Sequence, residues 1–99
     1  MIPDGYEMKT TFWRDFTIAD MFGDTAITDT FNRAFKEWKD NLDYMKELVL
    51  VLNWRCCLWY EKGNEKRSQL YCQYYQKSYD YGLDHFKGDD LTEFWSFLD

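Results

Sequence analysis

Three cysteines and a single histidine are the residues whose types best suit metal binding or nucleophilic catalysis. Cys72 and His85 lie thirteen residues apart on one predicted helix, which separates them by about 20 Å along its axis and prevents them from sharing one ion. Cys56 and Cys72 lie seven residues before and nine residues after Gly63, so an antiparallel hairpin could bring them to one level. Two thiols alone make a poor zinc site. We therefore expect no metal site and no cofactor.

Catalysis by these residues is not expected either. A nucleophilic cysteine needs activation by a base or by a helix N-terminus, whereas these cysteines fall within predicted helices among apolar neighbours. We interpret them as small buried hydrophobic residues. His85 lies among tyrosines, where a hydrogen bond to a tyrosine or to a backbone carbonyl is a simpler role than that of a catalytic base. A dinuclear carboxylate site needs Glu-x-x-His pairs on two helices, and the sequence contains no such pair. We expect a protein that is not an enzyme.

The number of cysteines and the lack of membrane signals predict where the protein resides. An odd number of cysteines, with Cys56 and Cys57 adjacent, does not match the disulfide framework of small secreted domains and favours reduced thiols. No apolar run approaches the roughly 20 residues needed to span a bilayer. The N-terminus lacks the basic start and apolar core of a signal peptide. We predict a cytoplasmic protein with no membrane partner.

The composition predicts a single compact domain, residues 1–99. A length of 99 residues suits one ordinary domain, and one proline with five glycines argues against long loops and disorder. Aromatic residues make up 21% of the chain, and each can bury roughly 150 to 250 Å², which allows a small domain to form a dense core. Residues 1–10 show no periodicity, and we predict that they form a mobile lead-in or a strap across the surface.

Hydrophobic periodicity predicts an all-α fold, a small helical bundle of three main antiparallel helices with short helical segments at both termini. The three main helices should span roughly residues 24–39, 42–62 and 65–87. The apolar segment before residue 23 should form one or two helical turns, and the apolar residues around residues 91–98 should pack back onto this bundle.

The turns between these helices have recognisable signals. Gly23 should end the first segment, and Asp24 or Thr25 should cap the helix that follows. Asn41 should cap the helix predicted at 42–62. The tripeptide Lys62-Gly63-Asn64 then combines a cation, a glycine able to adopt a left-handed conformation, and a new cap, which predicts a helical hairpin.

The stretch Leu48–Trp59, LVLVLNWRCCLW, lies within the predicted central helix and is apolar on nearly all sides. One stripe at helical spacing should form the inner core: Met45, Leu48, Val49, Leu52, Cys56 and Trp59. A second stripe projects from the other side and is a possible interface: Leu50, Trp54, Cys57 and Leu58. Either the termini of this chain or another chain should cover that second stripe.

The last long helix presents a broad tyrosine-rich face. Small residues in it would permit close approach of a neighbour or leave room for a ligand beside polar groups. This face is a possible pocket for a small molecule, lined by Tyr74, Ser78, Tyr81, Gly82 and His85.

Charge is unevenly distributed along the chain, whose net charge is −6. Residues 50–77 carry five bases against two acids, whereas residues 78–99 carry six acids against one base. The clustered cations Arg55, Lys62, Lys66 and Arg67 are too few for more than weak, salt-sensitive nucleic-acid binding, so we do not expect a nucleic-acid partner. The acidic segment instead suggests an inhibitor of a DNA-binding enzyme as one alternative function.

The stretches DTFNRAFKEWK, ELVLVLN and YEKGN resemble a group of small uncharacterised proteins carried on mobile elements or phage-like regions of gut bacteria. This resemblance covers about residues 11–90 and implies a cytoplasmic bacterial setting, with no established activity to transfer. The function we expect is a non-enzymatic interaction or regulatory protein, with a homodimer as one version, because the second apolar stripe and the many aromatic residues are typical of interfaces. A small-molecule binder and the acidic inhibitor are the alternatives.

Overall fold

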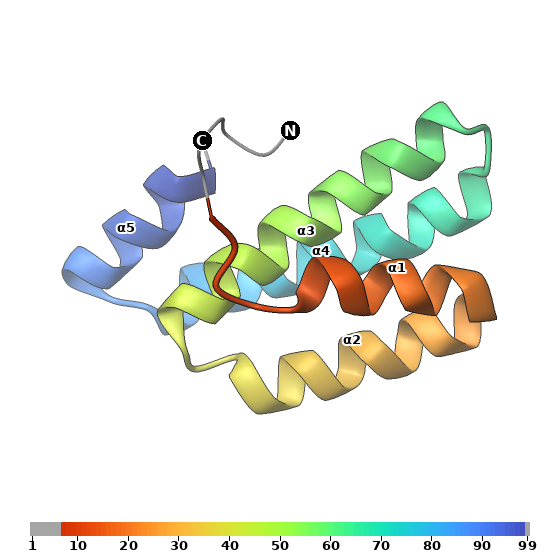
Figure 1. The fold of residues 1–99 in the computed structure, drawn as a ribbon. Helices are drawn as coiled ribbons and strands as arrows, with labels where there is room; N and C mark the ends of the chain where they lie inside the picture. Colours follow the sequence, from red (N-terminus) through yellow and green to blue (C-terminus); the bar gives the residue numbers. More distant parts are fainter. Residues whose placement is uncertain (1–6, 99) are drawn as a thin grey trace.

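Five α-helices make up most of residues 7–98, the part of the chain that the computed structural model describes (Figure 1). They are α1 (Phe12–Phe22), α2 (Asp24–Trp38), α3 (Leu42–Glu61), α4 (Glu65–His85) and α5 (Gly88–Leu98). No strand occurs within these residues, so the all-α prediction is confirmed, and the predicted bounds of the three longer helices are correct to within two residues. None of these helices is both long and apolar enough to cross a membrane.

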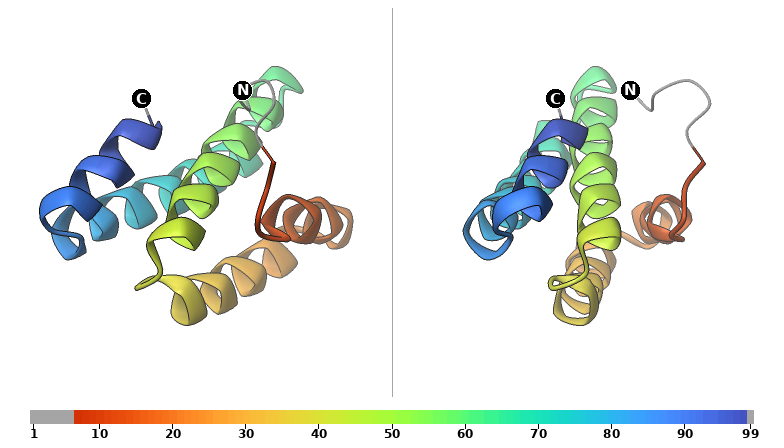
Figure 2. Two further views of the ribbon diagram at one scale, coloured as in Figure 1. Left: turned by 60° about the vertical axis from the view of Figure 1, so that its left-hand side comes forward. Right: turned by 90° about the vertical axis from the view of Figure 1, so that its left-hand side faces the viewer.

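Helices α3 and α4 form an antiparallel hairpin at the centre of the molecule (Figures 1 and 2). Gly63 adopts a left-handed φ of 81° in the turn, and the side chain of Asn64 accepts a hydrogen bond of 3.1 Å from the Arg67 amide. Asn41 caps α3 in the same way through the Tyr44 amide, at 3.1 Å. The predicted turn and both asparagine caps are confirmed.

Helices α1 and α2 meet at Gly23, whose φ of 113° allows the chain to reverse within one residue. The predicted cap by Asp24 or Thr25 is wrong, because Gly23 occupies the cap position and no side chain accepts a hydrogen bond there. The Asp24 carboxylate instead accepts a hydrogen bond of 2.9 Å from Arg67 Nε of α4. Asp24 therefore forms a long-range ion pair and does not cap its own helix.

The core lies between the α3–α4 hairpin and the three other helices. Helices α1 and α5 flank α3 on opposite sides, and α2 packs against α1 and α4 (Figure 2). The predicted inner stripe of α3 is largely confirmed, because its first four members are fully buried: Met45, Leu48, Val49 and Leu52. Its last two members, Cys56 and Trp59, are only half-buried.

Helix α5 docks on α4 through a ring that fills the space left by a glycine. A Cβ atom added to Gly82 would lie 2.2 Å from Cζ of Phe94, and the Phe94 side chain is fully buried. The prediction that small residues of α4 permit close approach of a neighbour is confirmed at this position.

The segment that leads into α1 is held by a buried carboxylate. Glu47 of α3 is fully buried and accepts hydrogen bonds from the amides of Lys9 and Thr10 and from the Thr10 hydroxyl, at 2.8–3.0 Å. The carboxylate is buried because the lead-in covers it and supplies these hydrogen-bond donors. Residues 9–10 thus form a strap, whereas residues 1–6 of the predicted lead-in lie outside the described residues.

Candidate functional site

An apolar groove runs between α1 and α3, and it includes three of the four residues predicted as an interface. Trp13 of α1 packs against Trp54, with ring centroids 4.8 Å apart. The groove has a volume of about 510 Å³ and is lined by Trp13, Trp54, Cys57, Leu58 and Glu61. Leu50, the fourth predicted residue, is half-buried and does not line it. Helix α1 therefore covers part of the second stripe of α3 and leaves the rest accessible.

The outer face of α1 extends this apolar surface. Ile18, Met21 and Phe22 are 47%, 80% and 78% exposed. Met21 lies eight residues after Trp13, about 80° around the helix axis, so it faces solvent and does not line the groove. Ile18 and Phe22 belong to the apolar segment that the sequence predicted before Gly23, but their side chains face away from the core. The buried face of α1 consists of Phe12, Phe16 and Ala19.

A buried polar cluster fixes α1 against the hairpin. Asp20, in the last turn of α1, forms an ion pair with Arg55 of α3, and the two side chains are only 6% and 5% exposed. Trp59 Nε1 donates to the same carboxylate at 3.0 Å, and the Tyr71 hydroxyl of α4 donates to its other oxygen at 2.5 Å. One carboxylate thus joins three helices. Sequence reasoning missed this role, because the partners lie 35 to 51 residues from Asp20.

Burial controls the ionisation of this cluster. Burial raises the pKa of Tyr71 to about 12, although the neighbouring charges of Arg55 and Arg67 partly oppose the shift. Burial also lowers the pKa of Arg55. The pairing with Asp20 compensates the cost of placing the Arg55 guanidinium out of water.

Two of the four cations considered for nucleic-acid binding are engaged inside the fold. Arg55 is buried, and its guanidinium lies 4.6 Å from the centroid of the Trp13 ring. Arg67 binds Asp24 and donates a hydrogen bond of 3.0 Å to the Asp20 carbonyl. Both arginines bind acidic or carbonyl oxygens of this chain.

The residues of the predicted ligand pocket do not surround an open space together. The Tyr74 ring stacks on the Phe31 ring with centroids 4.2 Å apart, and the Tyr74 hydroxyl forms a hydrogen bond of 2.6 Å with the Thr28 hydroxyl. Ser78 and Gly82 are buried, and the Phe94 ring occupies the room beside Gly82. The room expected at Gly82 is therefore taken by the protein itself.

The other two residues of that pocket lie at the end of α4. The Tyr81 hydroxyl donates to Asp40 at 2.5 Å and lies 3.4 Å from His85 Nδ1. His85 Nε2 lies 3.2 Å from the same Asp40 carboxylate. The predicted hydrogen bond between His85 and a tyrosine is confirmed, and the histidine is exposed.

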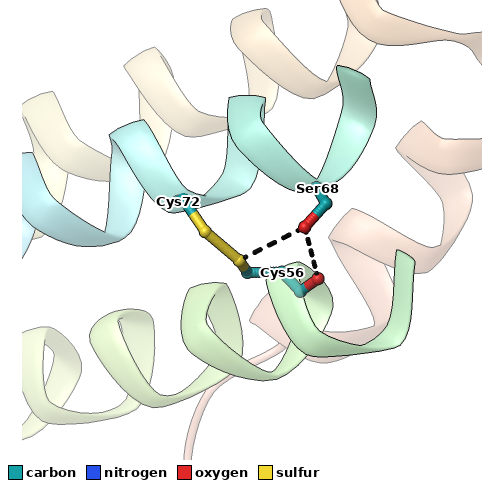
Figure 3. Close-up of a disulfide and its surroundings, with 3 residues drawn as sticks. All are labelled: Cys56, Ser68 and Cys72. Carbon is teal, nitrogen blue, oxygen red and sulfur yellow. Dashed lines mark hydrogen bonds between the residues drawn. A yellow bond between two sulfur atoms is a disulfide. The ribbon is translucent and has the colours of Figure 1, made fainter. Parts of the chain in front are cut away.

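The cysteines form the second chemically notable group. Cys56 of α3 and Cys72 of α4 form a disulfide, and the Ser68 hydroxyl donates to the Cys56 carbonyl at 2.9 Å (Figure 3). The expectation of three reduced thiols is wrong for this pair, although the spacing around Gly63 correctly brought the two cysteines to one level. Cys57 is free and exposed. Within residues 7–98, no group of three histidine, cysteine or acidic residues could hold a metal ion.

Comparison with known proteins adds no relative: no protein-family model, no curated protein and no solved structure matches this chain.

Proposed function

We propose that this protein is a non-enzymatic interaction protein, which binds another protein or a second copy of itself through the groove between α1 and α3 and the exposed outer face of α1. The exposure of Met21 and Phe22, at 80% and 78%, is the observation that most favours this function. Methionine and aromatic side chains are enriched at protein interfaces, and aromatic residues in pockets often supply most of the binding energy.

The rigidity of α1 supports the same proposal. Asp20 ties the last turn of α1 to α3 and α4, and Glu47 ties down the strap before its first turn. Helix α1 is thus held at both ends and cannot shift to bury Met21 without breaking these bonds. A preformed surface binds with a smaller loss of conformational entropy than one that must be ordered first.

The lining of the groove indicates what a partner should present. Trp13, Trp54 and Leu58 offer apolar surface, and Glu61 provides a carboxylate at one end. A large apolar side chain packed against the two tryptophans, with a cation near Glu61, would complement these groups. In a homodimer, the exposed Met21 or Phe22 of the second copy would supply that apolar side chain.

A pair of matched surface variants tests the proposal. Met21→Glu places a charge on the apolar outer face of α1, whereas Tyr60→Glu places one at a 70% exposed residue of α3. Both side chains are exposed, so both variants should fold. We expect wild-type protein at micromolar concentration to sediment as a dimer or to retain a protein partner in affinity capture, and only Met21→Glu to lose that association.

The proposal fails if wild-type protein sediments as a 12.2 kDa monomer and Met21→Glu still retains every protein that the wild type retains. It also fails if Tyr60→Glu weakens association as much as Met21→Glu does, because the outer face of α1 would then have no specific role.

A second candidate, an inhibitor of a DNA-binding enzyme, is favoured by the exposure of four aspartates on α4 and α5: Asp80, Asp84, Asp89 and Asp90. Their carboxylates face solvent, where they could compete with phosphates for a basic surface. Reversal of these four charges should abolish salt-sensitive binding to such an enzyme, and retained binding would exclude this candidate.

A further inference from the structure

Two tryptophans of this protein each hold an arginine of the same chain against the ring, with a carboxylate beside it. The Arg55 guanidinium lies 4.6 Å from the centroid of the Trp13 ring and forms an ion pair with an aspartate of α1. The Arg67 guanidinium lies 4.7 Å from the centroid of the Trp59 ring, and its Nε atom lies 2.9 Å from the Asp24 carboxylate. A guanidinium suits this arrangement because its flat face stacks on an aromatic ring while its N–H groups bind a carboxylate.

The groove between α1 and α3 offers the same two kinds of group without an arginine. It is lined by Trp13, Trp54, Cys57, Leu58 and Glu61, and Glu61 is the only charged group among these described residues. Within residues 7–98, no cation of the chain lies over the Trp54 ring, and none forms an ion pair with Glu61. The groove therefore combines an aromatic wall with a carboxylate that has no cationic partner in this part of the chain.

The neighbouring cations of the chain are engaged elsewhere. Lys62 follows Glu61 directly, but its Nζ atom lies 5.7 Å from the centroid of the Trp59 ring. Arg55 contacts one tryptophan of the groove, but its charge is compensated by the buried ion pair with Asp20. The Glu61 carboxylate is exposed. It is consequently available to a cation from outside the molecule.

The spacing of the groove residues on α3 suits a long side chain that is apolar along its length and cationic at its end. Trp54, Leu58 and Glu61 lie four and three residues apart, so they follow one another along one side of the helix. Trp54 and Glu61 are separated by about 10 Å along the helix axis, at 1.5 Å per residue. An aliphatic stem that packs on Trp54 and Leu58 therefore brings its charged end to Glu61.

We infer that this groove binds an arginine side chain that a protein partner presents, with the stem against Trp13 and Trp54 and the guanidinium on Glu61. The inference rests on the proposed function and names the chemical group by which the partner is recognised. Arginine suits the site better than lysine, because a planar guanidinium forms two parallel hydrogen bonds with a carboxylate and is more weakly hydrated than an ammonium group. Arg55 and Arg67 bind tryptophan rings and carboxylates in the same way inside the fold.

A titration with blocked amino acids tests the site. The probes are Nα-acetyl-arginine amide and its lysine and citrulline analogues, and the readout is the indole N–H signals of Trp13 and Trp54 in nuclear magnetic resonance spectra. We expect arginine amide, at up to about 50 mM, to shift both signals with a millimolar dissociation constant. Citrulline amide has nearly the same shape without the charge and should bind about fivefold more weakly, which is the most that an exposed ion pair contributes. Lysine amide should also bind more weakly than arginine amide.

Matched variants assign the effect to the groove. Glu61→Gln should weaken arginine binding about fivefold and remove the difference from citrulline. Glu37→Gln, which removes an exposed carboxylate of α2 outside the groove, should preserve that difference. Both side chains are exposed, so both variants should fold.

Met21→Glu separates this inference from the proposed function. Met21 does not line the groove, so this variant should keep the preference for arginine over citrulline even though it loses association with the partner. Failure of the titration would leave an association that depends on Met21 intact, and loss of that association would leave the titration intact.

Three results would overturn the inference. One is that neither indole signal responds to arginine amide, as would occur if the wild type sediments as a dimer in which a second copy fills the groove. Another is that citrulline amide or lysine amide binds as tightly as arginine amide. The third is that free arginine binds more than about tenfold more tightly than arginine amide, which would indicate a site for a small molecule and not for a protein side chain.

Discussion

Replacement of Asp20 by asparagine should destabilise this protein more than most substitutions that alter the shape of a side chain as little. The variant keeps the shape of the side chain but removes the charge that compensates buried Arg55. It also replaces a carboxylate oxygen, which accepts from Trp59 or Tyr71, by an amide group that can only donate. Loss of one partner of a buried ion pair costs about 3–5 kcal/mol, which is a large part of the 5–15 kcal/mol typical of a folded domain.

Urea unfolding followed by circular dichroism, without reductant, measures this cost. The matched control is Glu93→Gln, which removes a carboxylate 3.3 Å from Lys46 at a side chain that is 55% exposed. An exposed ion pair contributes about 0–1 kcal/mol, so the control should unfold near the wild-type midpoint. The double variant Asp20→Leu with Arg55→Met should recover part of the loss, because it leaves no charge buried without a partner.

The reasoning is refuted if Asp20→Asn lowers the free energy of unfolding by less than about 1 kcal/mol, or by no more than Glu93→Gln does. Either result would mean that the Arg55 guanidinium reaches water or another acceptor when Asp20 is neutral. A double variant less stable than Asp20→Asn would show instead that the packing of these side chains matters more than their charge.

Two further predictions concern α4. Gly82→Ala should lower the free energy of unfolding by about 1–3 kcal/mol, because the added Cβ atom would overlap the Phe94 ring. Alanine normally stabilises a helix relative to glycine. A variant that is more stable than the wild type in urea unfolding would therefore show that α5 can move aside. Burial raises the pKa of Tyr71 to about 12. The stabilisation of the folded state that results from this shift is therefore complete below about pH 10 and declines as the pH rises toward 12. Between pH 9 and pH 11 the wild type should lose about 1 kcal/mol more than Tyr71→Phe, and equal losses would contradict the assigned burial of the phenol.

Signals confined to a few neighbouring residues were sufficient for much of the fold. Gly63 and Asn64 specify their turn through their own backbone and side-chain chemistry, and Asn41 specifies the start of α3. The periodic apolar residues of α3 determine which side of that helix faces the core, since a period of 3.6 residues leaves little choice. The equal height of Cys56 and Cys72 in the hairpin likewise follows from their spacing around Gly63.

The candidate site was only partly predictable, because its residues come from two helices that are distant in the sequence. Trp54, Cys57 and Leu58 were identified because apolar residues outside the core stripe stand out in a sequence. Trp13, which completes the groove, belongs to another helix 41 positions away, and its approach to Trp54 depends on how α1 crosses α3. The exposure of Met21 and Phe22 depends on that same crossing.

The sequence by itself determined the helices, their turns and one buried face of α3, because these features depend on interactions within about four residues. Only the tertiary structure decided that Glu47 and Arg55 are buried, because a charged side chain enters the interior only where a distant partner meets it. Asp20 and the strap at residues 9–10 are those partners. The packing of Phe94 against Gly82 has the same origin, because it requires α5 to meet α4 at a specific height, which local patterns do not specify.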